Sequence, residues 1–214
     1  MTRDRHSPTA DVPNHHGDHP RFSGVSGLIA ALTMSFGRGA NAALAMDRTD
    51  LVSGDRVVDI GCGPGIAARK AALRGATVTG VDPSEMMLGV ARRQDRHRAV
   101  TWRAGAAEAL PLPDDSCDIA WSLSTVHHWG DLDKGLSEVH RVLSSGGRFL
   151  ATERRVKPGA TGLASHGWSD RQAETFGEHC SSAGFSTVEV TTHDSARGIL
   201  LAVLAYLETN CQDL

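Results

Sequence analysis

The sequence predicts an α/β fold in which a mostly parallel, seven-stranded sheet carries helices on both faces and ends in an antiparallel hairpin. Three observations predict this class. From Ser53 onward, short β-branched runs alternate with helical patterns, as expected for parallel strands joined by crossover helices. The first of these runs leads directly into a glycine-rich turn. The last two runs are separated by only a few residues, which is too short for a crossover helix, so they must pair antiparallel.

The expected strands are short apolar runs, rich in β-branched residues and bounded by turn residues. They are Arg56–Ile60, Thr77–Val81, Val100–Ala104, Cys117–Leu123, Arg148–Glu153, Ser186–Thr192 and Ile199–Leu207. The helices between them show apolar residues at helical spacing. They are Ile66–Arg74, Ser84–Arg93, Leu132–Leu143 and Ser169–Ala183. The third helix is expected to stop at Gly146-Gly147, a typical C-terminal signal.

The chain is expected to hold one domain, residues 21–214, behind a disordered leader of residues 1–20. Four histidines and three prolines in the leader indicate a solvated segment, with a metal-binding tail as the alternative. Residues 21–52 are expected to form a helical cap, because apolar residues recur at helical spacing over 22–36 and again over Ala40–Met46. This stripe lacks the Lys/Arg face of a membrane-surface helix, so it is expected to pack against the domain.

The composition excludes several classes of protein. The chain has 40% apolar and 22% charged residues, as in an ordinary globular domain, and its net charge of −3 offers no basic surface for nucleic acid. No apolar stretch reaches the roughly 20 residues that a membrane span requires, and no secretory signal is expected. The four scattered cysteines favour a reducing, cytoplasmic location over a disulfide framework.

The most informative segment is the glycine-rich turn Gly61–Gly65, between the first strand and the helix that follows it. Glycines there permit a positive φ and let the backbone approach a ligand closely. Open α/β sheets bind ligands at the carboxyl ends of their strands, next to this turn. Asp82 ends the second strand, where a carboxylate can accept hydrogen bonds from both hydroxyls of a ribose. Together, the turn and the acid predict a nucleoside-containing cofactor; taken alone, Asp82 could equally cap the helix after Pro83.

Two departures from the dinucleotide-binding fingerprint bear on which cofactor this is. The third glycine comes one residue early, so that Ile66 occupies its place, and the terminal hairpin is foreign to a standard dinucleotide-binding domain. Five segments, in order and with matching spacing, resemble the class I S-adenosylmethionine-dependent methyltransferases of the small-molecule type, whose fold is Rossmann-like. These segments are Val58–Gly65, Gly80–Leu88, Ala107–Ser122, His127–Trp129 and Glu138–Phe149.

The resemblance implies S-adenosylmethionine as the cofactor, S-adenosylhomocysteine as the product, and a role for each matched position. The residues implied around the methionine part are Asp59, Gly61, Cys62, Gly63 and Gly65. Asp82 is implied to hold the ribose hydroxyls. The residues implied on the two sides of the adenine are Pro83, Met86 and Met87, and Ala107 and Glu108. Ser122 is implied near the sulfonium.

One position departs from the pattern of the family. Many relatives carry an acid where this chain has Ala106, and that acid accepts a hydrogen bond from the adenine amino group. Alanine cannot do so, and the amino group must then be met by the backbone, by water or by Glu108. Three rival hypotheses stay open: an NAD-dependent oxidoreductase, a nucleic-acid-modifying enzyme, and a non-catalytic binding protein with the methyltransferase fold. Ile66 and the terminal hairpin disfavour the oxidoreductase, and the negative net charge disfavours the nucleic-acid-modifying enzyme. The intact glycine turn and Asp82 disfavour a non-catalytic protein.

The sequence also narrows the chemistry of the acceptor. No N-P-P-Y-type tetrapeptide follows the fourth strand, so amino-directed DNA methylation is not expected, and no grouping of acids or thiols indicates a metal site. Metal-independent transfer to O, N, S or C of a small molecule remains. His127 and His128 follow the fourth strand and are candidates for a general base, His127 being preferred. The alternative is that both pack the loop with Trp129.

The walls of the substrate pocket are expected in two segments, residues 21–38 and Val156–Trp168. Their aromatic, aliphatic and imidazole side chains would suit a flat or lipid-like acceptor, and core packing explains the same side chains equally well. These side chains are Phe22, Met34, Phe36, His166 and Trp168.

Overall fold

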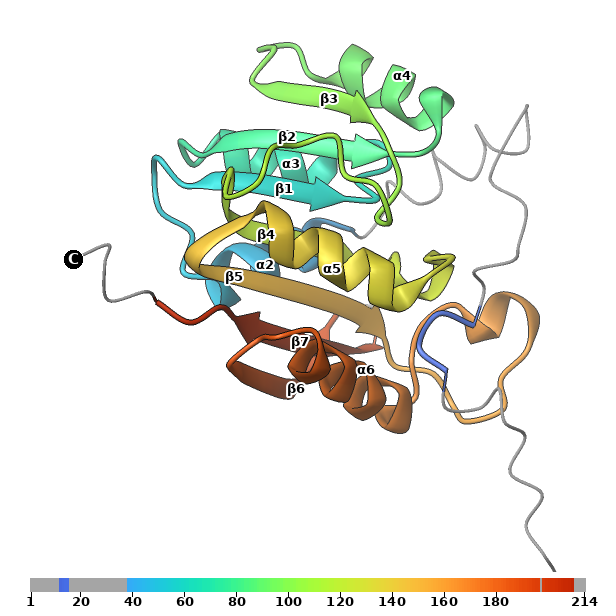
Figure 1. Cartoon of the computed structure of the whole chain (residues 1–214). Helices are drawn as coiled ribbons and strands as arrows, with labels where there is room; N and C mark the ends of the chain where they lie inside the picture. The colour runs from blue at the N-terminus through green and yellow to red at the C-terminus, as the bar shows by residue number, and fades with distance from the viewer. Residues whose placement is uncertain (1–11, 16–37, 197, 210–214) are drawn as a thin grey trace, which may run out of the picture.

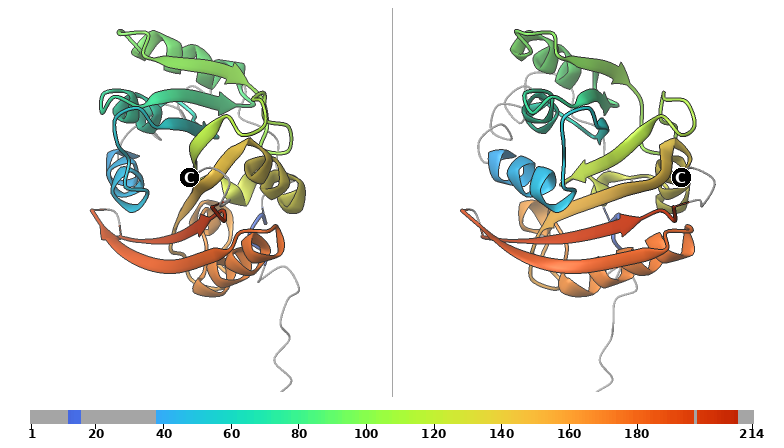
Figure 2. Two further views of the ribbon diagram at one scale, coloured as in Figure 1. Left: turned by 60° about the vertical axis from the view of Figure 1, so that its left-hand side comes forward. Right: turned by 90° about the vertical axis from the view of Figure 1, so that its left-hand side faces the viewer.

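The computed structural model describes residues 12–15, 38–196 and 198–209. Seven strands form one sheet in the order β3-β2-β1-β4-β5-β7-β6 (Figure 1), and Figure 2 shows β3 and β6 at its opposite edges. The strands are β1 Arg56–Ile60, β2 Thr77–Asp82, β3 Val100–Ala104, β4 Cys117–Leu123, β5 Leu143–Arg154, β6 Thr187–Ser195 and β7 Gly198–Tyr206. The first five strands are parallel, while β7 pairs antiparallel with both β5 and β6. The predicted fold class is confirmed.

Helices cover both faces of the sheet, as the strand–helix alternation requires. The α-helices are α2 Arg38–Arg48, α3 Ile66–Ala72, α4 Glu85–Gln94, α5 Leu132–Val142 and α6 Asp170–Ser182, and the 3₁₀ helices are η1 Val126–His128 and η2 Gly162–Ser165. In Figure 1, α5 and α6 lie in front of the sheet, with α2 and α3 behind it. Two apolar cores result, one on each face. None of the described helices is long and apolar enough to cross a membrane.

The junction between α5 and β5 differs from the prediction. The helix ends at Val142 and β5 begins at Leu143, five residues before the expected start, so Gly146 and Gly147 lie inside the strand. Leu143 already pairs with Cys117 of β4, and the register of the two strands then shifts before Arg148 pairs with Ile119. The positive φ of Gly146, +70°, accommodates this irregularity. The two glycines therefore serve a bulge rather than a helix cap.

The segment Val12–His15, inside the predicted leader, is instead held against the domain. Trp168 Nε1–H donates to the Pro13 carbonyl at 2.9 Å, and Asn14 Nδ2–H donates to the Trp129 carbonyl at 3.0 Å. Each hydrogen bond joins residues more than 100 positions apart in the chain. The helix expected over 22–36 lies outside the described residues, whereas the one expected over Ala40–Met46 is α2.

An ion pair between Arg56 and Asp118 joins the starts of β1 and β4. It lies at the amino ends of these strands, whereas the glycine turn follows the carboxyl end of β1. The backbone N–H and Nε–H of Arg56 donate to Asp118 Oδ2 at 2.8 and 3.0 Å, and Ser144 Oγ–H donates to Oδ1 at 3.0 Å. These bonds, the side-chain bonds from Arg56 above all, lower the pKa of Asp118 from 3.8 to about 2. The ion pair is therefore sensitive to acid.

Replacement of Asp118 by asparagine tests this sensitivity. Because the pKa of Asp118 is depressed in the folded chain, its contribution to the free energy of unfolding is complete above about pH 4 and is lost as the pH falls through about 2. We expect Asp118→Asn to lose less stability than the wild type between about pH 5 and pH 2 in urea unfolding. The exposed Asp50→Asn is the control and should follow the wild type. Equal pH dependence in all three proteins would contradict the assignment.

Candidate functional site

The glycine-rich turn closes over the ends of β1 and β2. Gly61 and Cys62 both donate their backbone N–H to the Val81 carbonyl, at 2.8 and 3.0 Å. Gly61, Gly63 and Gly65 have φ angles of +68°, +53° and +74°, which residues with a Cβ rarely adopt. The turn therefore depends on its glycines, as predicted, and it leads directly into α3.

Two of these glycines are also required by neighbouring side chains. A Cβ on Gly65 would lie 2.1 Å from the indole of Trp102, and a Cβ on Gly61 would lie 2.7 Å from the side chain of Thr125. The Trp102 ring comes from β3 and donates its Nε1–H to Asp95 Oδ2 at 3.2 Å, which fixes its position beneath the turn. Packing thus accounts for Gly65 independently of any ligand.

We expect Gly65→Ala to destabilise the fold by about 2–4 kcal/mol, because the new Cβ overlaps the indole and strains the backbone. Gly159→Ala is a matched control, since Gly159 has the same φ of +74° but nothing within 4 Å of the added Cβ. Backbone strain alone predicts a loss of about 1 kcal/mol there. Urea unfolding of both variants measures the difference. Equal losses would show that Trp102 does not constrain the turn.

Asp82 connects the glycine turn to α4. Its side chain is buried, and its two oxygens accept from the backbone N–H groups of Gly63 (Oδ2) and Ser84 (Oδ1), both at 2.8 Å. Ser84, and not Asp82, caps α4 by accepting from the N–H of Met87. An ionised carboxylate offers about four acceptor positions. Asp82 therefore places a buried hydrogen-bond acceptor beside the turn, at the carboxyl end of β2.

A hollow lies on the α2 side of the turn. It is lined by residues of α2, β1, the turn, α3 and β4, namely Asn41, Asp59, Gly61, Cys62, Ile66, Ala67 and Leu123. Asn41 was not predicted: its Nδ2–H donates to Ser124 Oγ at 3.1 Å, which ties α2 to the loop after β4. The predicted Asp59 and Cys62 thus share one concave surface with the turn.

The structure describes all of the residues expected around the adenine. Met87 and Ala107 are buried, on α4 and in the segment after β3. Glu108 instead bonds to the loop after η1, where its Oε1 accepts from the backbone N–H groups of Gly130 at 2.6 Å and Asp131 at 3.2 Å. Glu108 therefore connects two loops rather than presenting this oxygen to a ligand.

The loop after β4 contains a residue that the prediction missed. Ser122, expected near the sulfonium, is fully buried, and its hydroxyl lies 2.7 Å from the hydroxyl of Thr125. Thr125 Oγ1–H donates to the Ile60 carbonyl at 3.1 Å, so the Thr125 side chain is held against Gly61. Thr125, rather than Ser122, is the hydroxyl residue beside the turn.

His127 is held by a buried carboxylate. Its Nδ1 lies 2.8 Å from Oε1 of Glu153, which is fully buried at the end of β5, and the His127 side chain is only 4% exposed. An Nδ1–H donor to this carboxylate leaves Nε2 with its lone pair. Trp129 anchors the same loop, because its indole packs against Gly135 of α5 and stacks on Phe149. Trp129 thus packs the loop, which is the part that the alternative expectation gave it.

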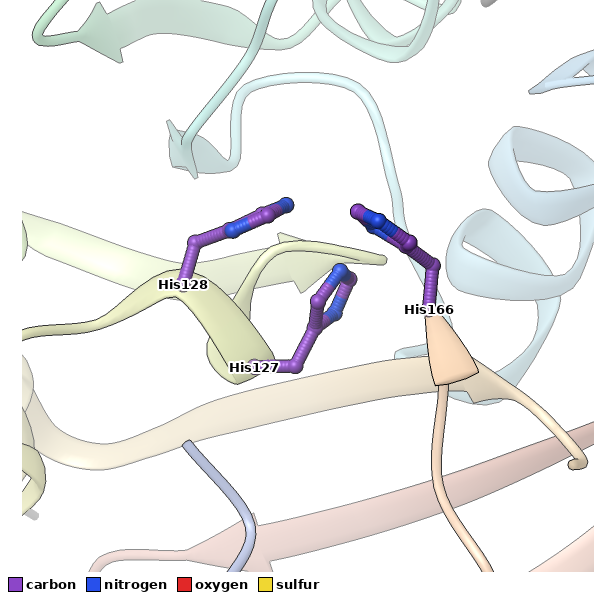
Figure 3. Close-up of side chains that lie close together, drawn as sticks. All are labelled: His127, His128 and His166. Carbon is purple, nitrogen blue, oxygen red and sulfur yellow. The ribbon is translucent and has the colours of Figure 1, made fainter. Parts of the chain in front are cut away.

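A third histidine joins His127 and His128. Figure 3 shows the three imidazoles turned toward a common space, with His166 arriving from the end of η2. The ring centroids of His127 and His128 are 4.1 Å apart, and each lies 5.4 Å from that of His166. Burial, and then the nearby His127, lowers the pKa of His166. A neutral imidazole at His166 is therefore favoured.

Only some of the residues expected to line the substrate pocket lie near the three histidines. Trp168 is fully buried, packs on Phe176 with ring centroids 4.8 Å apart, and is part of the core rather than of a pocket. Phe22, Met34 and Phe36 lie outside the described residues. His166 is the member of the predicted set that lies at the site. Glu153 was not predicted at all, because it directly follows the buried run Phe149–Thr152 near the end of β5 and no local motif marks it.

Comparison with known proteins matches the centre of the chain to one family. Residues 58–151 match the family described as a methyltransferase domain. The chain is 40% identical over 101 residues to the ubiquinone/menaquinone biosynthesis C-methyltransferase UbiE of Rubrivivax gelatinosus, over 47% of this chain and 40% of that protein. It is 40% identical over 97 residues to the malonyl-[acyl-carrier protein] O-methyltransferase of Erwinia billingiae, over 45% of this chain and 38% of that protein.

A solved structure extends the likeness beyond the matched segment. The S-adenosylmethionine-dependent methyltransferase from Mesorhizobium loti superposes with a TM-score of 0.64 at 26% identity, over 77% of this chain and 96% of that one. The present chain spans about two fifths of the length of the two curated relatives. Residues 58–151 thus form a methyltransferase domain of the S-adenosylmethionine-dependent type, for which S-adenosylmethionine is the cofactor, and the rest of the chain is similar to such enzymes in its fold.

Proposed function

We propose that this protein transfers a methyl group from S-adenosylmethionine to a small-molecule acceptor. The observation that carries the proposal is the buried Asp82 carboxylate, which stands at the carboxyl end of β2 and is joined to the glycine turn through the N–H of Gly63. The chain's residues fit the cofactor, since a ribose has two hydroxyl donors and the turn offers a backbone surface without side chains. When bound, the cofactor supplies an electrophilic methyl group on a sulfonium.

The chain's own contribution to the transfer is alignment and the exclusion of water. Asp82 would hold the ribose, while Asp59 and the backbone of the turn would surround the methionine part. Pro83, Met86, Met87 and Ala107 would form the adenine walls. We propose that this step is metal-independent, because the sulfonium already activates the methyl group.

An acceptor that must lose a proton needs a base as well. We propose His127 for this role, because Glu153 holds its Nδ1 and thereby presents Nε2 as the proton acceptor. His128, adjacent in η1, is the second candidate from the sequence, and it is half-buried. Glu153 acts through His127 and is a positioning residue.

The class of acceptor is inferred from charge and from relatives. The names of the two curated relatives describe a C-methyltransferase of ubiquinone/menaquinone biosynthesis and an O-methyltransferase that acts on malonyl-[acyl-carrier protein]. The net charge of −3 and the missing tetrapeptide disfavour nucleic acid as a substrate. None of the described cysteines Cys62, Cys117 and Cys180 forms a disulfide, and we propose a cytoplasmic location.

A transfer assay tests this function. The full chain is incubated with methyl-labelled S-adenosylmethionine and a panel of quinols, phenols, carboxylic acids, thiols and amines. We expect label in one acceptor class, S-adenosylhomocysteine in equal amount, and no loss of activity with a chelator present. An Asp82→Ala protein is the negative control. Label transfer that persists unchanged in that variant, or that stops when metal is removed, would overturn the proposal.

A further inference from the structure

We propose that His127, His128 and His166 form a binding site for a divalent transition metal of the zinc class. One nitrogen from each imidazole lies within 4.8 Å of the other two, among the described residues. The three side chains come from η1 and from the end of η2 and face one space (Figure 3). No sequence motif indicates this cluster of three histidines, because His166 is far from His127 and His128 in the chain.

The geometry is within reach of tetrahedral coordination. Zinc binds histidine nitrogens at about 2.0–2.1 Å, so that two ligands of one tetrahedral ion lie about 3.3 Å apart. The nitrogens must therefore draw together by at most about 1.5 Å from their separation of up to 4.8 Å. His128 and His166 are only partly buried and can turn about χ1 and χ2, while His127 stays fixed by Glu153. The fourth position would face the common space.

The surroundings of His127 are those of a metal ligand. Histidines that bind metals almost always donate their other ring N–H to a carboxylate, a carbonyl or water, which orients the ring and raises its basicity. The bond of 2.8 Å between His127 Nδ1 and Glu153 Oε1 provides this support. Glu153 is fully buried, and its Oε2 has no hydrogen-bond partner among the described residues. A cation beyond His127 would offset this buried carboxylate.

The backbone that carries His166 is held in place from two directions. Arg154 Nη2–H donates to the carbonyls of Ala164 and His166, at 3.3 and 3.2 Å. His15 Nε2–H donates to the Ser165 carbonyl at 2.8 Å, and Gln172 Nε2–H donates to His15 Nδ1 at 3.2 Å. His15 therefore uses both ring nitrogens for structure and is not counted as a ligand. The backbone around His166 is therefore fixed before any ion binds, and only the side chains must adjust.

The donor atoms select the class of metal. Imidazole nitrogens suit Zn²⁺, Co²⁺, Ni²⁺ and Cu²⁺, whereas Mg²⁺ and Ca²⁺ require oxygen ligands that this group lacks. An ion bound here would occupy Nε2 of His127, the nitrogen that accepts the proton in the proposed transfer. The metal-loaded protein is then expected to lose the base, so the ion would inhibit. This consequence rests on the proposed function, whereas metal binding itself does not.

Direct titration tests the site. Zn²⁺ is titrated into metal-stripped full-length protein against a chromophoric chelator, and Co²⁺ is added in parallel to read the coordination from its visible spectrum. We expect one ion per chain and the intense bands of four-coordinate Co²⁺. His166→Ala and His128→Ala should each weaken Zn²⁺ binding at least about 100-fold, and Glu153→Gln should weaken it about 10- to 100-fold.

Two controls separate this site from the other histidines of the chain. His140→Ala and His193→Ala should leave Zn²⁺ binding unchanged, because both lie outside the group. A triple change of His6, His16 and His19 to alanine removes leader histidines and should also leave it unchanged. Unaltered Zn²⁺ affinity in a folded His166→Ala protein, or loss of binding only in the triple variant, would overturn the proposal. An absence of any Zn²⁺ binding would do the same, whatever the outcome of the transfer assay.

Discussion

Replacement of Asp82 by alanine is expected to reduce the affinity for S-adenosylmethionine at least tenfold while the fold persists. The variant loses the carboxylate that would accept from two ribose hydroxyls, and hydrogen bonds to a charged group contribute roughly 1.5–3 kcal/mol each before relaxation. It also releases the N–H groups of Gly63 and Ser84, which loosens the turn where the cofactor would lie. Both effects act in the same direction.

Isothermal titration calorimetry of the variant measures this loss. Asp118→Ala is the matched control, because Asp118 also accepts from a backbone N–H. It lies near the start of β4, at the amino ends of the strands and away from the turn. We expect Asp118→Ala to lower the free energy of unfolding without changing cofactor affinity. An Asp82→Ala protein with the dissociation constant of the wild type would refute the ribose role of Asp82.

Replacement of His127 by alanine is expected to lower turnover about 100-fold or more at saturating S-adenosylmethionine, with cofactor affinity intact. The expectation applies to an acceptor that must lose a proton. Glu153→Gln retains an oxygen that can accept from His127 Nδ1 but removes the charge, so it separates the position of the ring from its basicity. Its expected effect is smaller than that of His127→Ala.

Single-turnover rates in the presence of a chelator provide the measurement, since the chelator removes any ion from His127. His128→Ala is the comparison on the neighbouring side chain and is expected to lose less than tenfold. If both histidine variants lose less than tenfold, alignment alone carries the reaction and the general base is wrong. Cofactor titration of each variant excludes an indirect effect on binding.

The sheet could be predicted because its signals are local. The starts and ends of β1, β3 and β4 follow from β-branched runs bounded by turn residues, and they coincide with the prediction. The start of β5 could not be predicted in this way. Gly146-Gly147 is a typical helix stop, and only the pairing of Leu143 with Cys117 shows that the strand has already begun. Strand register is a long-range property that a single segment does not contain.

The site residues that could be predicted are likewise those that lie close together in the sequence. The glycine turn and Asp82 are adjacent elements of one βαβ unit, so their meeting was predictable. Glu153 and His166 reach His127 from other parts of the chain, and Asn41 reaches the loop after β4 from α2. The neighbouring carboxyl ends of β4 and β5 are the one signal that could have suggested Glu153. Glu108 was expected beside the adenine, but its Oε1 accepts hydrogen bonds from the distant loop residues Gly130 and Asp131. The sequence around Glu108 does not indicate this contact.

The measurement that tests the account most directly is a calorimetric titration of the wild-type chain with S-adenosylhomocysteine, with S-adenosylmethionine and with NADH. The turn, the buried Asp82 and the family assignment predict binding of both adenosyl compounds at one site per chain and no binding of NADH. Asp82→Ala should abolish or strongly weaken the adenosyl signal in the same experiment. Binding of NADH with neither adenosyl compound bound would contradict the account and support a dehydrogenase instead.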